Sequence, residues 1–156
     1  MKKYQIVCIT EIIVHGISPK QIYDFMFSLT NEKYLQWHRE HKEFKVIKET
    51  KDTIGSVFYF NEVINDFKID YDWKVVSVER NKKIIMKASK YLIPIYLEIT
   101  LKEEGNNTQV KHHLKTGNCV TYWIIKKYFF TEERSRDLDR HVKEEFTNLE
   151  WLIHKS

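Results

Sequence analysis

The sequence predicts an α+β domain in which an antiparallel sheet wraps around a long C-terminal helix. Between residues 44 and 116, apolar and polar side chains alternate with a period of two, which is typical of half-buried strands. Residues 133–154 contain no Gly or Pro and place apolar side chains at helical spacing. A long amphipathic helix after such a sheet is expected to pack across its concave face and close a cavity. The chain has 156 residues, and we expect a single domain over residues 1–156.

The N-terminal part of the chain predicts one strand followed by two short helices. Residues 4–15 are rich in Ile and Val and are interpreted as a strand. Ser18 is a good N-cap and Pro19 a good first helical residue, so a helix is expected to begin there. Thr30 is a second start signal, and the stretch that follows it, to residue 41, is interpreted as helical.

The middle of the chain predicts six further strands joined by short turns. Their expected ranges are 43–50, 55–65, 67–79, 83–90, 94–103 and 108–116. The connections contain Gly, Asn and Asp and are too short for crossover helices, so the sheet is expected to be an antiparallel meander. Residues 118–133 are crowded with aromatic and aliphatic side chains, and they fit either a short helix or a lid.

The final helix carries two ionisable residues on its apolar side. Ser135 is the candidate N-cap. The apolar stripe consists of Leu138, Val142, Phe146, Leu149, Leu152 and Ile153. Glu145 falls near the middle of this stripe and His141 at its edge. A carboxylate in a core costs several kcal/mol unless it is paired or bound to a metal, and two residues one turn apart can reach a single ion.

Composition and charge exclude several classes of protein. The net charge of +4 is spread among interleaved Lys and Glu, without the basic patch or module that nucleic-acid binding needs. No apolar run approaches the ~20 residues of a membrane span. The N-terminal apolar run is broken by Gln5, Thr10 and Glu11, so no signal peptide is expected. Cys8 and Cys119 lack a metal-type spacing. We expect a cytoplasmic protein, and the sequence leaves its oligomeric state open.

Four further polar residues could meet the helical pair. Glu62 lies in a strand that is apolar on both faces, so it is expected to be buried or nearly so. His38 and His41 are three residues apart and could share a helical face, although solvated surface histidines would look the same. His112 shares a strand face with apolar residues and is expected to point towards the helix, whereas His113 points to solvent. A core histidine without a function is an equal interpretation of His112.

Two sites follow from these residues. The metal set comprises His38, Glu62, His141 and Glu145. Two histidines and two carboxylates suit zinc, while the oxygen ligands leave iron or manganese open. The ligand-binding set comprises Tyr59, Tyr71, Trp73 and Tyr96. Aromatic side chains make up 14% of the chain, which fits either a cavity lined for a flat apolar molecule or plain packing.

The order of elements resembles the START or Bet v 1-like helix-grip superfamily (SRPBCC), which includes polyketide cyclases. The resemblance covers nearly the whole chain and also rests on Ser18-Pro19 at the first helix and Gly55 before a strand. It implies a ligand cavity between helix and sheet.

A narrower resemblance concerns the metal set. Trp37-His38-x-x-His41, then Glu62, then His141-x-x-x-Glu145 is similar to the metal site of the diacetylphloroglucinol and phloretin hydrolases. The resemblance implies that a zinc ion is held by four residues: His38, Glu62, His141 and Glu145. It also implies cleavage of a carbon–carbon bond between an acyl group and a phenolic ring. His41 or His112 would then be catalytic and pass a proton to the leaving ring carbon.

Two functions therefore compete at the level of sequence. The first is a zinc-dependent hydrolase of an aromatic or polyketide-like ketone. The alternative is a protein of the same superfamily that binds a hydrophobic small molecule without catalysis, in which case Glu145 would pair with His38 or Arg39. The sequence does not decide whether the protein is an enzyme.

Overall fold

Seven antiparallel strands form one sheet in the computed structural model, which describes residues 5–90 and 92–155. The strands are β1 (Gln5–Val14), β2 (His41–Lys48), β3 (Val57–Ile64), β4 (Phe67–Glu79), β5 (Lys83–Lys90), β6 (Ile93–Glu104) and β7 (Asn107–Thr116). The helices are α1 (Pro19–Phe27), α2 (Asn31–Trp37), α3 (Cys119–Tyr128) and α4 (Glu132–Lys155). In the sheet the strands follow the order β1-β7-β6-β5-β4-β3-β2, so β2 to β7 form a meander and β1 adds to its far edge.

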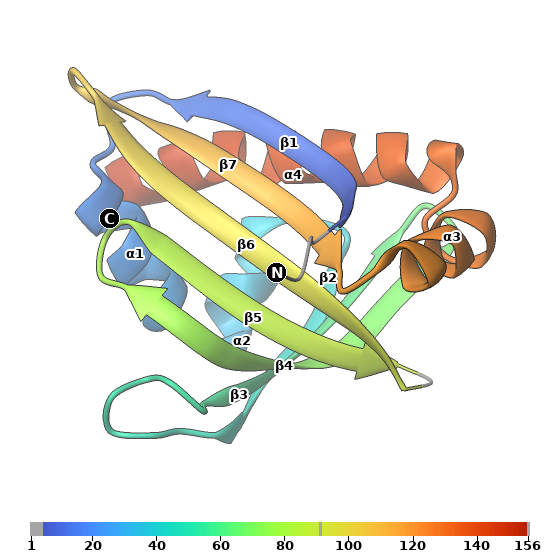
Figure 1. Cartoon of the computed structure of the whole chain (residues 1–156). Helices are drawn as coiled ribbons and strands as arrows, with labels where there is room; N and C mark the ends of the chain where they lie inside the picture. Colours follow the sequence, from blue (N-terminus) through green and yellow to red (C-terminus); the bar gives the residue numbers. More distant parts are fainter. Residues whose placement is uncertain (1–4, 91, 156) are drawn as a thin grey trace.

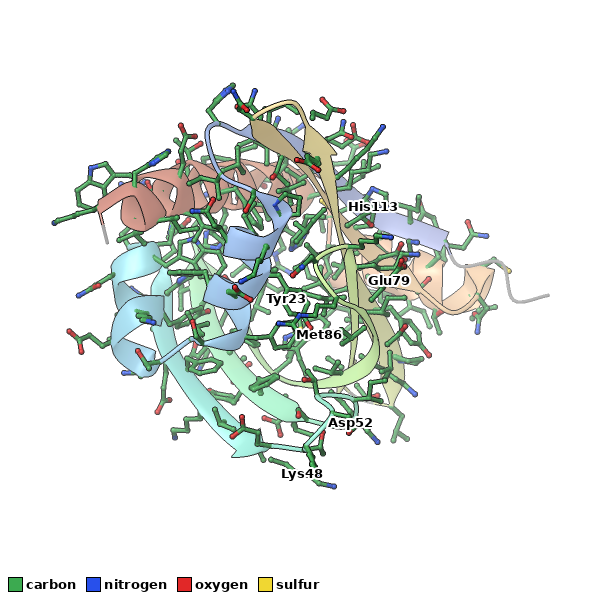
Figure 2. The ribbon with its side chains drawn as sticks, turned by 90° about the vertical axis from the view of Figure 1, so that its left-hand side faces the viewer. Tyr23, Lys48, Asp52, Glu79, Met86 and His113 are labelled. Carbon is green, nitrogen blue, oxygen red and sulfur yellow. The ribbon has the colours of Figure 1, made fainter. Side chains whose placement is uncertain are left out.

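The long helix α4 crosses one face of this sheet, as Figure 1 shows. Its apolar stripe is buried there through Leu138, Val142, Phe146 and Leu149. Figure 2, which looks from the end that carries α1, shows Met86 of β5 near the middle of the molecule and Lys48 at its rim. The predicted α+β architecture, an antiparallel sheet around a C-terminal helix, is thus confirmed.

Side-chain caps define where the helices begin. Ser18 Oγ accepts a hydrogen bond from Gln21 N at 3.2 Å, and Gln21 Oε1 accepts one from Ser18 N at 2.9 Å. This capping box starts α1 as the sequence predicts. The predicted helix over 133–154 is confirmed, but Ser135 as its N-cap was wrong, because α4 begins at Glu132 and Ser135 lies inside it. Thr131 directly precedes the helix, and its side-chain Oγ1 accepts a hydrogen bond from Arg134 N at 3.4 Å.

Two boundaries differ from expectation in ways that affect the site. Helix α2 ends at Trp37, and β2 already begins at His41, so His38 and His41 do not share a helix.

In the segment 118–133, α3 confirms the interpretation as a short helix. Phe130 follows it and packs edge-on against Phe67, with ring centroids 5.3 Å apart. Within residues 5–90 and 92–155, no helix combines the length and the apolar character needed to cross a membrane.

Candidate functional site

A cavity of about 120 Å³ lies between α4 and the sheet. Its sheet wall is formed largely by inward-facing apolar side chains, namely Phe58, Phe60, Ile69, Tyr71, Trp73, Ile95, Leu97, Ile99 and Leu114. Val142 and Phe146 of α4 close it from the other side. Since one buried water needs roughly 10–15 Å³ by a comparable measure, the space suits several waters or a small apolar group.

Only two of the four predicted ligand-binding residues line this cavity. Tyr71 and Trp73 do, together with their neighbour Ile69 on the same face of β4. Tyr59 and Tyr96 do not, because side chains alternate along a strand and their neighbours Phe58 and Leu97 point inwards. Both tyrosines instead lie close to lysines, with Lys45 Nζ and Lys87 Nζ each 5.8 Å from a ring centroid.

Four ionisable side chains converge at the wall of the cavity. His41, Glu62, His141 and Glu145 each offer one nitrogen or oxygen atom, and these atoms lie within 4.8 Å of one another. His41 and Glu62 are directly opposite each other on β2 and β3, whereas His141 and Glu145 are one turn apart on α4. The sheet and the helix therefore each supply one histidine and one glutamate.

The geometry of this cluster fits a metal ion. His141 Nε2 lies 2.8 Å from Glu62 Oε2 and also contacts Glu145 Oε1, and His41 Nε2 lies 3.5 Å from Glu145 Oε1. Nevertheless, both buried Nε2 atoms lack a partner in hydrogen-bond geometry among the described residues. The four atoms are thus close enough together to share one ion. In a tetrahedral zinc site, ligands about 2.1 Å from the ion lie roughly 3.4 Å from each other, close to this spacing.

Opposite charges hold the cluster together without an ion. Burial alone would lower the pKa of His141, but the negative charge and close contact of Glu145, followed by Glu62, raise it to about 11. Burial would also raise the pKa of Glu145, but His141 and then His41 hold it well below its usual range. His141 is therefore an imidazolium between carboxylates when no metal is bound. Glu145 pairs with His141 and His41 rather than with Arg39 or His38.

His41 is oriented by its neighbour Tyr34. The main-chain carbonyl of Tyr34 accepts a hydrogen bond from His41 Nδ1 at 2.7 Å, and the Tyr34 ring stacks on the imidazole with centroids 3.9 Å apart. When the imidazole is neutral, its Nε2 therefore carries the lone pair and faces the cluster. A histidine with this kind of backbone support is typical of a metal ligand.

The structure does not bring the predicted ligand His38 into the cluster. Its Nδ1 accepts a hydrogen bond from Glu40 N at 3.0 Å, and its Nε2 donates to Glu144 Oε2 at 2.7 Å. Both ring nitrogens are thus occupied. His38 is buried, so it is not a solvated surface residue either. His41, for which the sequence predicts a catalytic role, occupies the position expected for His38.

His112 lies where the sequence predicts, in the cavity wall contributed by β7. Burial lowers its pKa, and the negative charges of Glu145 and Glu62 compensate only in part. At neutral pH it is therefore a neutral imidazole beside the cluster. Its predicted catalytic role stays a prediction.

Sequence reasoning missed Glu40, which contacts the outer side of His141. Glu40 lies in the turn between α2 and β2, where no periodicity shows which way a side chain points. The residue in the sequence that could have pointed to Glu40 was Arg140, one residue before His141 and one turn before Glu144. An arginine beside a buried histidine needs an acidic partner.

Comparisons with known proteins identify the fold. No family model and no curated protein sequence matches this chain. Among solved structures, it is similar to the protein TTHA0849 from Thermus thermophilus, with a TM-score of 0.70, 12% identity and coverage of 95% of this chain and 97% of that one. It is also similar to a START superfamily protein from Mycobacterium smegmatis, with a TM-score of 0.69, 12% identity and coverage of 97% and 99%.

A third similar structure is Ara h 8.0201, with a TM-score of 0.67, 10% identity and coverage of 95% and 98%. The chain therefore has the helix-grip α+β fold of the Bet v 1-like and START proteins. At identities this low, the likeness concerns the fold.

Proposed function

We propose that this protein binds a small, largely apolar molecule of the size of an aromatic ring, with its polar end directed at the cluster of His41, Glu62, His141 and Glu145. The observation that carries the proposal is a polar cluster in a largely apolar cavity wall. Most lining residues are apolar or aromatic, while His41, Glu62 and Glu145 lie together within that lining. Binding sites for small molecules commonly combine apolar walls with a few convergent polar groups.

The cluster itself is proposed to hold a divalent metal, with zinc the best match to two imidazoles and two carboxylates. The support is the convergence of four ligand atoms and the two buried Nε2 atoms without hydrogen-bond partners among the described residues. A bound zinc ion would polarise a ligand carbonyl and lower the pKa of a coordinated water. The protein itself contributes to such a site by excluding bulk solvent and by orienting the imidazoles.

Ligand binding can be tested in a calorimeter with indole, a largely apolar probe of about the proposed size. The folded protein should bind the probe saturably. Leu97→Trp fills the cavity from the inward face of β6 and should weaken probe binding at least tenfold, that is by ~1.4 kcal/mol. The matched control is Tyr96→Trp. Tyr96 directly precedes Leu97 and faces away from the cavity, so this variant should bind the probe like the wild type. Equal binding by both variants would contradict the proposed site.

Metal binding can be tested by titrating chelator-treated protein with Zn²⁺ in a calorimeter. Glu145→Ala removes both ligand oxygens and should abolish tight binding, whereas Glu133→Ala, in the exposed first turn of α4, should not. A wild-type protein that takes up no zinc would remove the metal from the proposal and leave the apolar binding site.

Hydrolysis of an acylated phenol is the second candidate function, and the position of His112 favours it. A neutral imidazole in the cavity wall can relay a proton, so that water adds across the carbon–carbon bond: hydroxide to the acyl carbon, and a proton to the ring carbon. Zinc-loaded protein incubated with 2,4,6-trihydroxyacetophenone should then release acetic acid and phloroglucinol. His112→Gln should stop the release without weakening binding of indole. No release by the wild type leaves the binding function alone.

A further inference from the structure

His141 faces a carboxylate on each side of its ring. Its Nε2 points to Glu62 and Glu145 in the cluster, and its Nδ1 lies 3.0 Å from Glu40 Oε1 on the opposite side. His141 has no exposed surface, and Glu40 is 9% exposed. The two ring nitrogens therefore have separate partners, of which only the set at Nε2 opens into the cavity.

Glu40 is held in place by a closed network between the α2–β2 turn and α4. Arg140 Nη2 donates to both carboxylate oxygens, at 3.1 and 3.2 Å, and Asn65 N donates to Oε2 at 3.0 Å. Arg140 Nη1 also contacts Glu144 Oε2 at 2.9 Å, which in turn accepts from His38 Nε2. The main-chain N–H of Glu40 donates to His38 Nδ1 and completes the ring.

These contacts surround the Glu40 carboxylate with donors. Oε1 faces His141 Nδ1 at 3.0 Å, Oε2 accepts from Asn65 N, and the guanidinium of Arg140 contacts both oxygens. A fixed anion at Nδ1 stabilises the imidazole form that is protonated there. When the ring is neutral, as a metal ligand must be, Nε2 is then the nitrogen with the lone pair, on the side of the cluster.

We propose that Glu40 is a positioning residue for the metal site: it holds His141 by Nδ1 so that Nε2 binds the ion. This inference rests on the proposed metal binding and assigns a role to a residue outside the four ligands. Metal-bound histidines generally donate their second N–H to such a carboxylate, which fixes the ring and makes the ligand more basic.

The same residues do not form a second metal site. One atom each of His38, Glu40 and His141 also lies within 4.8 Å of the others. However, the ring nitrogens of His38 are both used within the network, and His141 Nδ1 already faces the Glu40 carboxylate that Arg140 neutralises. A second cation there would have to displace the guanidinium of Arg140.

The test compares Zn²⁺ affinity in competition with a fluorescent chelator. Glu40→Gln keeps the shape of the side chain and removes its charge, and it should weaken zinc binding by about 10- to 100-fold. Glu43→Gln is the matched control, since Glu43 pairs with Lys45 on the surface and should leave the affinity unchanged. Unchanged affinity of Glu40→Gln would overturn the role of Glu40 and leave the metal site standing. A wild-type protein that binds no zinc would overturn both.

A measurement on the wild type covers the case in which Glu40→Gln does not fold. Nitrogen-15 NMR of the zinc-loaded protein distinguishes the two ring nitrogens of His141. We expect a slowly exchanging proton on Nδ1 and the shift of a metal-bound nitrogen on Nε2. Zinc on Nδ1, or rapid exchange of the Nδ1 proton, would overturn the proposal, and neither result depends on whether a variant is stable.

Discussion

His41 and Glu62 face each other across the first residue pair of β2 and β3, and His41 Nε2 lies 3.7 Å from Glu62 Oε2. The pairing of the two strands thus determines this half of the cluster. The other half is determined by the helical spacing of His141 and Glu145. Because both halves come from regular elements packed against each other, folding alone preorganises the four side chains.

The first prediction separates the two candidate histidines. His41→Ala removes a proposed ligand and should weaken zinc binding by more than the ~10–100-fold that an outer partner contributes. His38→Ala disturbs only the network around Glu40 and should stay within that range. Chelator competition measures both affinities. If His38→Ala has the larger effect, then His38 rather than His41 binds the metal.

The second prediction concerns the packing of α4. Leu149 has no exposed surface, so Leu149→Ala leaves a cavity and should lower the free energy of unfolding by about 2–5 kcal/mol. Trp151 is 60% exposed two residues further on, and Trp151→Ala should change stability by no more than about 0.5 kcal/mol. Urea unfolding followed by circular dichroism measures both. Similar losses for the two variants would mean that the buried face of α4 is misassigned.

The periodic spacing of apolar residues was enough to predict most of the fold and part of the site. Alternation predicted the sheet, and helical spacing predicted that Glu145 and His141 lie on the inner side of α4. Apolar residues on both faces of β3 predicted that Glu62 lies largely away from solvent, and its side chain is 18% exposed. These predictions hold because burial of apolar area dominates where a regular element packs.

The remaining errors lie at boundaries, where periodicity gives no information. Whether His38 or His41 reaches the cluster depends on where α2 ends, and the chain leaves the helix at Trp37. Glu40 lies in the turn that follows, so its contact with His141 depends on tertiary structure alone. The error at Tyr96 is one of strand face: with aromatic and aliphatic residues on both sides of β6, sequence alone did not show which face is inward.

The third prediction concerns the two cysteines. Cys119 is exposed, whereas Cys8 is buried and its Sγ lies 3.6 Å from Ser135 O. Burial and then the charge of Asp139 raise the pKa of Cys8, which reduces its reactive thiolate at pH 8. Iodoacetamide should therefore modify one thiol quickly, and the second only in denaturant. Mass spectrometry of Cys119→Ser should show no rapid modification; a fast reaction in that variant would contradict the burial of Cys8.

The last prediction is a pH dependence on the face of the sheet away from α4. Glu98 Oε2 accepts from Lys115 Nζ at 2.7 Å, and Glu98 Oε1 lies 3.5 Å from Lys83 Nζ. Partial burial would raise the pKa of Glu98, but Lys115 and then Lys83 lower it below the ordinary value of 4.5. A carboxylate with a lowered pKa stabilises the fold above the pKa of the unfolded chain, and this stabilisation is lost as the pH falls through the folded value.

Glu98→Gln should therefore lower the free energy of unfolding at pH 7 by an amount below about 1 kcal/mol, since the pair is only partly buried. The difference from wild type should persist down to about pH 5 and shrink below 4.5, as the wild-type carboxyl itself takes up a proton. Glu79→Gln is the control, because its side chain is 63% exposed and its contact with Lys82 contributes little. Urea unfolding at a series of pH values measures the three proteins. A difference that stayed constant from pH 7 to pH 3 would show that Glu98 acts through packing rather than through charge.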